Sequence, residues 1–268
     1  MDRVGELDAG AAMDLLRDGE LTVEGRLVDA SNATLFCEVC AGPTRARCVY
    51  KPVAGERPLW DFPDGTLAGR EVASFAVSQA TGWGVVPPTV MRDGPFGPGM
   101  CQLWVDSDDA VDLVDVLAPD ALPPGWLHVL DALGGAGEPV VLGHADDARL
   151  RRMAVLDVVL NNADRKGGHV LPGLDGVVRG VDHGVTFHTE PKLRTLLWGW
   201  AGDALTTEER AVLEVLRDDI DGSLGSRLTE LVAPSEVTAC RRRVERMLRD
   251  GHLPYPAEGW PAIPWPPF

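Results

Sequence analysis

Asp164 and Asp182 are the first candidates for chemistry, because the chain places them at the two ends of one predicted hairpin. Asp164 follows an apolar run with helical spacing, and Asp182 ends the strand-like segment 176–181. A hairpin between them would bring both carboxylates to the same end. One such acid can bind a hard cation through oxygen while the other orients a hydroxyl group or a water. The alternative is that each aspartate only caps a turn.

A second candidate group lies in the first third of the chain. Lys51, one of only three lysines, ends the strand-like run 46–51, and Glu71 lies on a predicted helix that should pack against the same sheet. The connector 30–34 offers backbone N–H groups and the polar side chains of Ser31 and Asn32 to phosphate oxygens. A strand lysine paired with a helix glutamate beneath a phosphate loop is how kinases hold a nucleotide. The connector lacks the glycine-rich form of that loop, and a strand lysine can also simply face solvent.

The elements that must position these residues can be read from periodicity and turn residues. The first part of the chain predicts two helices and five strands: helices 8–20 and 66–80, and strands 21–28, 34–40, 46–51, 85–91 and 99–105. The second part predicts a connector with a short helix at 106–125. Four further helices are predicted at 146–160, 206–218, 223–232 and 234–250. The Pro/Trp-rich tail, 254–268, is predicted to be extended or mobile. This pattern predicts an α+β protein of two lobes. Residues 1–105 form a small antiparallel-sheet lobe with a central helix, and residues 106–268 form a larger, mainly helical lobe.

Charge and cysteine usage narrow the function classes. The net charge is −16, from 41 acidic and 25 basic residues, which disfavours nucleic acids and anionic membranes as partners. Cys37 and Cys40 are three apart on a predicted strand, so their side chains point to opposite faces and do not suit a zinc site. We find no signal-peptide pattern at the N-terminus, and we expect a cytoplasmic protein.

The motifs around these residues resemble the phosphatidylinositol 3-/4-kinase-like group of the protein-kinase-like fold. The sequence is most similar in motif to type II phosphatidylinositol 4-kinases and to small bacterial proteins of that group. "VYKP" contains Lys51, "NNADRKGGHVL" contains Asp164 and Arg165, and "VDHGVTF" contains Asp182 and Phe187. The match is confined to these short motifs, but their order spans residues 21 to 188.

The resemblance implies how a nucleotide would be held. Lys51 would contact the α- and β-phosphates of ATP with Glu71 as its ion-pair partner, and the loop 30–34 would cover the phosphates. The hinge strand would offer backbone groups to adenine, with one tryptophan near the ring. That strand corresponds to Gln102, Leu103, Trp104 and Val105.

The resemblance also assigns the catalytic and metal positions. Asp164 would orient the acceptor hydroxyl or accept its proton, with Arg165 bracing the loop, and Asp182 would hold Mg²⁺ or Mn²⁺. His169 stands five residues after Asp164, where the family has asparagine, and would be a second metal ligand. Imidazole is a poor substitute for an oxygen ligand of magnesium. Three alternatives stay open: a weak second metal site, an oxygen supplied by Asn161 or Asn162, and a protein that binds nucleotide but transfers phosphate poorly.

The substrate does not follow from the family. A lipid kinase works on an anionic membrane surface, whereas this chain is strongly acidic and shows no cationic amphipathic helix. We therefore expect an ATP-dependent phosphotransferase that acts on a soluble hydroxyl acceptor, either a protein, its own chain or a small polyol. A nucleotide-binding regulatory module and an AMP transferase are the alternatives.

Overall fold

The N-terminal lobe is built on a five-stranded antiparallel sheet. The computed structural model describes residues 8–27 and 32–268, and the sheet has the strand order β1-β2-β3-β5-β4. The strands are β1 (Glu20–Arg26), β2 (Leu35–Ala41), β3 (Thr44–Pro52), β4 (Thr89–Gly94) and β5 (Gly97–Leu103). Side chains of β2 and β3 alternate between buried and partly exposed, as expected where one face of a strand is covered. Cys37 and Cys40 lie on opposite faces, as predicted.

Two helices cover the sheet. Helix α1 (Ala9–Asp18) packs on β4, β5 and β2, and its leucines join the cysteines and Tyr50 in one apolar core. Helix α2 (Leu67–Thr81) begins at Thr66, whose hydroxyl accepts the N–H of Gly69, and ends at Gly82 in the left-handed conformation. Its residues are buried on almost every side because α2 packs on β4 and β5 and also on the helices of the second lobe.

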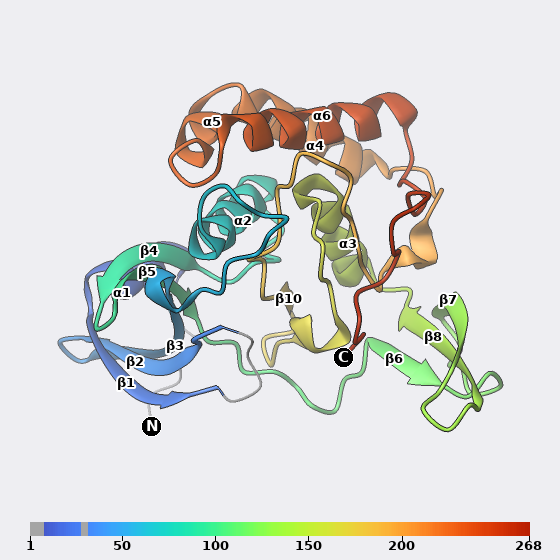
Figure 1. The fold of residues 1–268 in the computed structure, drawn as a ribbon, viewed down its shortest axis with the longest axis horizontal. Coiled ribbons are helices and arrows are strands. Elements are labelled where there is room, and N and C mark those ends of the chain that lie inside the picture. Colours follow the sequence, from blue (N-terminus) through green and yellow to red (C-terminus); the bar gives the residue numbers. More distant parts are fainter. Residues whose placement is uncertain (1–7, 28–31) are drawn as a thin grey trace.

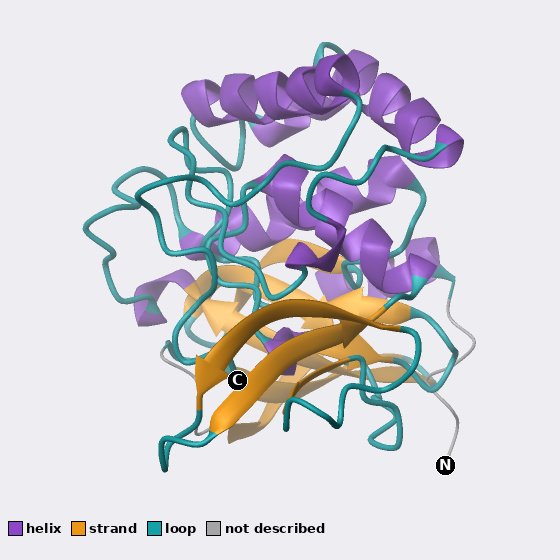
Figure 2. Ribbon diagram, turned by 90° about the vertical axis from the view of Figure 1, so that its right-hand side faces the viewer, coloured by secondary structure: helices purple, strands orange, loops and turns teal. Residues whose placement is uncertain are grey.

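The C-terminal lobe surrounds helix α3 (Ala148–Leu160), which lies at the centre of the larger apolar core (Figure 1). The other helices are α4 (Thr207–Ile220), α5 (Ser223–Leu228) and α6 (Pro234–Asp250), with a short turn of helix, η4, at Trp198–Trp200. Figure 2 shows these helices on one side of the molecule and the strands on the other. The two-lobed protein-kinase-like architecture predicted from the sequence is therefore confirmed.

A three-stranded antiparallel sheet lies where the sequence predicted a connector with a short helix. Its strands are β6 (Val114–Leu117), β7 (Trp126–Leu133) and β8 (Pro139–Ala145), in the order β6-β8-β7. The helix prediction within 106–125 was wrong.

Pro119 lies in this stretch, two residues after the end of β6, together with Pro123 and Pro124. Proline lacks an N–H donor and interrupts a helix, so these residues disfavour one here. The segment Val114–Leu117 pairs with β8 instead.

A short hairpin and the chain's last residues complete the lobe. Strands β9 (Val170–Pro172) and β10 (Val178–Gly180) pair antiparallel, as predicted between the two aspartates. The segment 254–268 lies along the body of the protein: the N–H of Thr195 donates to Ala262 O, and the N–H of Gly167 donates to Pro267 O. Of the two conformations predicted for the tail, the structure shows the extended one.

Two further predictions concern the chain as a whole. The boundary between the two lobes at residues 105/106 stays a prediction. The last strand of the five-stranded sheet ends at Leu103, and the next strand, β6, belongs to a separate sheet. Within residues 8–27 and 32–268, no helix combines the length and apolar character needed to cross a membrane.

Candidate active site

Lys51 lies on the face of β3 opposite to the core beneath α1, in which Cys48 and Tyr50 are buried. Its Nζ is 2.8 Å from Glu71 Oε1, and Glu71 is buried in the middle of α2. The other oxygen of Glu71 accepts the backbone N–H of His183 at 2.8 Å. Glu71 therefore connects the sheet to the loop that carries Asp182.

Asp182 follows β10 and completes an ion-paired group with the same lysine. Lys51 Nζ is 2.9 Å from Asp182 Oδ1, and half of the Asp182 side chain remains exposed. The backbone of Asp182 has a φ of 60°, which is uncommon for a residue with a side chain. Lys51 holds the pKa of Asp182 well below its usual range. Burial acts to lower the pKa of Lys51. The carboxylates of Asp182 and Glu71 raise this pKa by more than burial lowers it, so the Lys51 amine is charged.

Asp164 lies in the loop after α3, with its carboxylate partly exposed. Its N–H donates to Asn162 Oδ1 at 3.0 Å, which fixes the start of the loop. Burial raises the pKa of Asp164. The charge of Lys166 lowers it, and the Asp182 carboxylate raises it further. Lys166 Nζ is 3.6 Å from Asp164 Oδ2. The hairpin thus brings the two predicted acids into one electrostatic environment.

His169 lies between these acids. Its Nδ1 is 3.0 Å from Asp164 O, and its Nε2 is 3.4 Å from Asp182 Oδ2. A carbonyl oxygen only accepts, so we assign the ring proton to Nδ1, which leaves the Nε2 lone pair facing a carboxylate. Burial is the main cause that lowers the pKa of His169 to about 4, so the ring is neutral at pH 7.

This arrangement fits a divalent metal ion. Two acceptor atoms that converge without a proton between them are stabilised by a shared cation, and ligands in adjacent coordination positions lie about 3 Å apart when the metal–ligand distance is about 2.1 Å. A nitrogen and a carboxylate oxygen suit Mn²⁺ better than Mg²⁺. Among the described residues, no group of three or more His, Cys, Asp or Glu side chains could hold a metal. Further ligands would have to come from the nucleotide.

Asn161 and Asn162 do not supply the missing oxygen. Asn161 caps α3 in the left-handed conformation, its Nδ2 donates to His188 O and Glu190 O, and its Oδ1 accepts the N–H of Lys192. Asn162 is fully buried and its Nδ2 donates to Asp157 Oδ1 at 2.9 Å. Both amides hold the loop in place, so that alternative is wrong.

Arg165 is fully buried and joins the loop of Asp164 to the loop of Asp182. It forms an ion pair with Asp157 on α3, with Nη2 3.0 Å from Asp157 Oδ1 and neither side chain exposed. Its Nη1 donates to Val181 O at 2.9 Å, and its Nη2 lies 2.6 Å from His183 Nε2. With no exposed surface, Arg165 can position the two loops but cannot touch a substrate.

The hinge residues are less available than the resemblance implied. The Gln102 side chain is buried and donates to Thr89 Oγ1. The N–H of Leu103 donates to Pro88 O, and the N–H of Trp104 donates to Arg47 O. These three donor groups are therefore already engaged and do not reach a ligand. The Trp104 ring packs edge-on against Phe36, with centroids 5.0 Å apart. Within the described residues, no hydrogen bond engages the N–H of Val105.

The phosphate-loop prediction is only partly covered by the structure. Ser31 lies outside the described residues. Asn32 accepts the N–H of Arg57 through Oδ1 at 2.9 Å. Asn32 also borders a recess of about 20 Å³ that Lys51, Glu71 and Asp182 line.

Two residues of this site were missed by the sequence analysis. Asp157 lies within the apolar helix run "MAVLDVVL", where a buried acid is itself a signal, because a charge inside an apolar face needs a partner. His183 directly follows Asp182, but its contact with Arg165 could not be predicted from spacing. Its Nδ1 is buried without a hydrogen-bond partner among the described residues.

The chain resembles two solved structures in fold. A structure of hydra Fam20 with sugar is similar with a TM-score of 0.55 at 13% identity, covering 93% of this chain and 89% of that one. A crystal structure of the Golgi casein kinase is similar with a TM-score of 0.51 at 12% identity, covering 90% of this chain and 73% of that one. At such low identity the likeness establishes the protein-kinase-like fold, and it does not single out the phosphatidylinositol 3-/4-kinase-like group.

Sequence comparison identifies a relative of nearly the same length. No family model matches the chain. Protein Rv2133c of Mycobacterium tuberculosis is 53% identical over 263 residues, which cover 95% of this chain and 94% of that protein. The chain therefore belongs to the same protein family as Rv2133c.

Proposed function

We propose that the protein is an ATP-dependent phosphotransferase that acts on a soluble hydroxyl acceptor. One observation carries the proposal: Lys51, Glu71 and Asp182 form a connected ion-paired group, and His169 links Asp182 to the loop of Asp164. Kinases need a phosphate-binding cation, a metal-binding acid and a hydroxyl-orienting acid in one cleft. The kinase-like fold supports the same reading.

The nucleotide would bind between the lobes. Lys51 would bind phosphate oxygens while Glu71 fixes its position, and Asn32 would lie at the phosphate end of the cleft. The N–H of Val105, which makes no hydrogen bond within residues 8–27 and 32–268, is the group we assign to adenine. The recess beside Lys51 is smaller than a triphosphate, so binding requires the contact between Lys51 and Asp182 to open.

Transfer would then need one proton acceptor. Asp164 would take the proton of the acceptor hydroxyl as the hydroxyl oxygen forms a bond to the γ-phosphorus. The bond from that phosphorus to the β–γ bridging oxygen breaks, and ADP leaves with the electron pair. The raised pKa of Asp164 makes it a better base than an ordinary carboxylate. Arg165 holds the loop so that this carboxylate keeps its position.

Asp182 and His169 would hold the divalent metal ion. When bound, the ion neutralises charge on the phosphate oxygens during transfer. The neutral His169 ring offers Nε2 without first losing a proton at pH 7. We infer that Mn²⁺ is preferred to Mg²⁺, because one ligand is an imidazole.

We also propose that the motifs place the protein near the phosphatidylinositol 3-/4-kinase-like group, without its lipid substrate. The net charge of −16 opposes work at an anionic membrane surface and binding to nucleic acid. A soluble acceptor in the cytoplasm is the proposal that fits this charge. The competing function is a nucleotide-binding module with little turnover, favoured by the replacement of the family asparagine with His169.

The two acids can be separated by nucleotide binding. Asp182→Asn should abolish the dependence of ATP binding on Mn²⁺, because it removes the metal-binding charge. Asp164→Asn should leave the affinity for ATP unchanged, because its role begins at the transferred phosphate. Calorimetric titration of both variants with and without Mn²⁺ measures this, and an equal loss of affinity in the two would show that their roles are wrongly assigned.

A further inference from the structure

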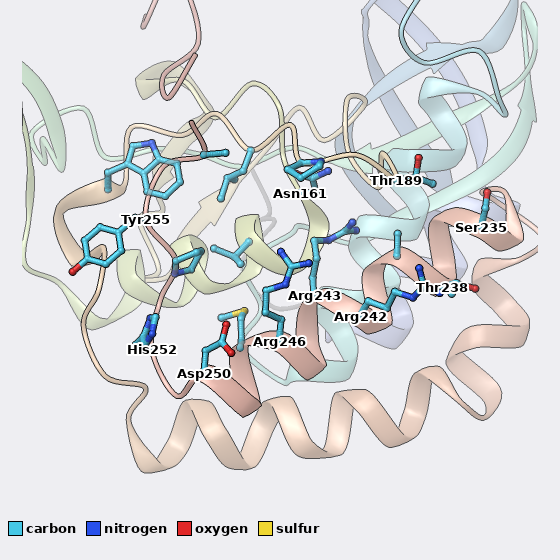
Figure 3. A pocket seen from close by; sticks show the side chains of 18 residues that line it. Asn161, Thr189, Ser235, Thr238, Arg242, Arg243, Arg246, Asp250, His252 and Tyr255 are labelled. Atoms are coloured by element: carbon cyan, nitrogen blue, oxygen red, sulfur yellow. The ribbon is translucent and has the colours of Figure 1, made fainter. Parts of the chain in front are cut away.

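A cavity lies in the C-terminal lobe, away from the cleft. It has a volume of about 510 Å³, within the range of small-molecule sites. Helix α6 forms its base, the end of α3 and the segment 189–198 form another wall, and residues 250–257 close one end (Figure 3). Neither Lys51, Asp164 nor Asp182 lines it.

One face of α6 supplies much of the lining. Side chains three or four positions apart lie on the same face of a helix, and the lining residues of α6 follow this spacing. They are Ser235, Thr238, Ala239, Arg242, Arg243, Arg246, Met247 and Asp250. Apolar side chains on the other walls include Val158, Leu193 and Trp198. The cavity therefore combines an apolar interior with a cationic helix face.

The arginines of this face lack acidic partners. Arg242 and Arg246 are exposed, and within the described residues neither forms an ion pair or a side-chain hydrogen bond, whereas the exposed Arg249 and the half-buried Arg217 both form ion pairs. Two like charges four residues apart destabilise a helix. The one acid of the cavity, Asp250, already pairs with Arg249. The cavity thus keeps an uncompensated positive charge in a strongly acidic protein.

Arg243 adds a third cation that is held in place. Its Nε donates to Val159 O at 2.8 Å and its Nη1 donates to His188 O at 3.1 Å. Its Nη2 is buried and has no partner in the described part of the chain. Burial lowers the pKa of Arg243, and the neighbouring Arg246 acts in the same direction. A nearby negative charge would act in the opposite direction and favour the charged form of Arg243.

We propose that this cavity binds a small organic anion with an apolar body. The apolar part would contact Val158, Leu193 and Trp198, and the anionic group would be bound by Arg242 and Arg246. The volume favours a small molecule, and the unpaired arginines favour a negative charge. The proposal does not depend on the phosphotransferase function, because no residue of the cleft takes part.

A pair of fluorescent dyes tests the proposal. 8-Anilinonaphthalene-1-sulfonate has an apolar aromatic body and one negative charge, and N-phenyl-1-naphthylamine has the same body without the charge. The folded protein should bind the anionic dye more tightly. Arg242→Gln combined with Arg246→Gln should weaken binding of the anionic dye about tenfold, because two exposed charge contacts, each of modest strength, are removed. The neutral dye should be unaffected by that change.

Two further variants complete the test. Ala239→Trp fills the cavity without changing its charge, so it should weaken both dyes. Arg217→Gln removes an arginine from α4, outside the cavity, and should change neither. Equal affinity of the two dyes for the wild type, or dye binding that survives both the double glutamine variant and Ala239→Trp, would overturn the proposal. Thermal unfolding of each variant confirms that the dyes report the folded state.

Discussion

Two charged clusters flank the strand β10, and they are built differently. In the cleft, Lys51 shares its charge between Glu71 and Asp182, and half of Asp182 is exposed. Behind it, Asp157 and Arg165 are fully buried, and Asn162 and Thr195 also donate to Asp157. The exposed cluster can exchange a partner for a phosphate or a metal, whereas the buried cluster cannot open without leaving a charge unpaired. The first cluster is suited to chemistry and the second to holding the loops.

The largest expected effect is on turnover in the cleft. Asp164→Asn should lower the rate of phosphate transfer about 10²–10⁴-fold, because an amide cannot take the hydroxyl proton. Its unfolding temperature should stay close to that of the wild type. Asp175→Asn, an exposed aspartate of the hairpin that pairs with Arg179, is the matched control and should keep its activity. A variant at Asp164 with full turnover would remove this residue from the mechanism.

The next effect is on stability, in the buried cluster. Asp157→Ala leaves the Arg165 guanidinium buried without its carboxylate, which should cost about 3–5 kcal/mol of unfolding free energy. Asp175→Ala breaks an ion pair with a partly exposed partner and should cost about 1 kcal/mol or less. Denaturant unfolding measures both. Similar losses of unfolding free energy in the two variants would mean that the buried ion pair contributes no more to stability than a surface ion pair.

A smaller effect is expected on nucleotide affinity. Lys51→Ala removes a cation that would contact two phosphates, a type of contact that contributes about 1.5–3 kcal/mol, so ATP affinity should fall at least about tenfold. Arg45→Ala, on the exposed start of the same strand, should leave affinity unchanged. Calorimetry compares the two, and an unchanged affinity in the lysine variant would refute the assignment of the N-terminal lobe.

The smallest effect concerns metal preference. His169→Asn restores the oxygen ligand of the family, so activity with Mg²⁺ should rise relative to activity with Mn²⁺. His128→Asn makes the same change on β7, far along the chain from the cleft, and should not alter the ratio. Loss of activity with both ions in the His169 variant would show that the ring has another role than metal binding.

The fold could be predicted where burial leaves a regular pattern. Strands β2 and β3 alternate cleanly, and turn residues separate them, so the meander was identified. Strand β7 is exposed at irregular intervals, and the sheet that it forms with β6 and β8 gave no period to detect. Proline-rich flanks made that region look like a connector.

The candidate site could be predicted where residue type alone carries the chemistry. Lys51, Asp164 and Asp182 are recognisable in this way; Lys51 pairs with Asp182 at 2.9 Å, and the Asp182 carboxylate affects the pKa of Asp164. The direction of a side chain is not visible in a sequence. Asn161 looks like a possible ligand until its left-handed cap conformation turns the amide toward residues 188–192. The pairing of Asp157 with Arg165 depends on tertiary packing in the same way.

Label transfer tests whether the cleft transfers the γ-phosphate of ATP. The purified protein is incubated with Mn²⁺ and ATP labelled at the γ-phosphate or, separately, at the α-phosphate, with Asp164→Asn as the inactive control. The γ-label alone should reach an acceptor hydroxyl, on the chain itself or on an added polyol, and the Asp164→Asn variant should transfer none. Transfer of α-label would instead identify an AMP transferase, and no transfer of either label despite ATP binding would contradict the phosphotransferase proposal.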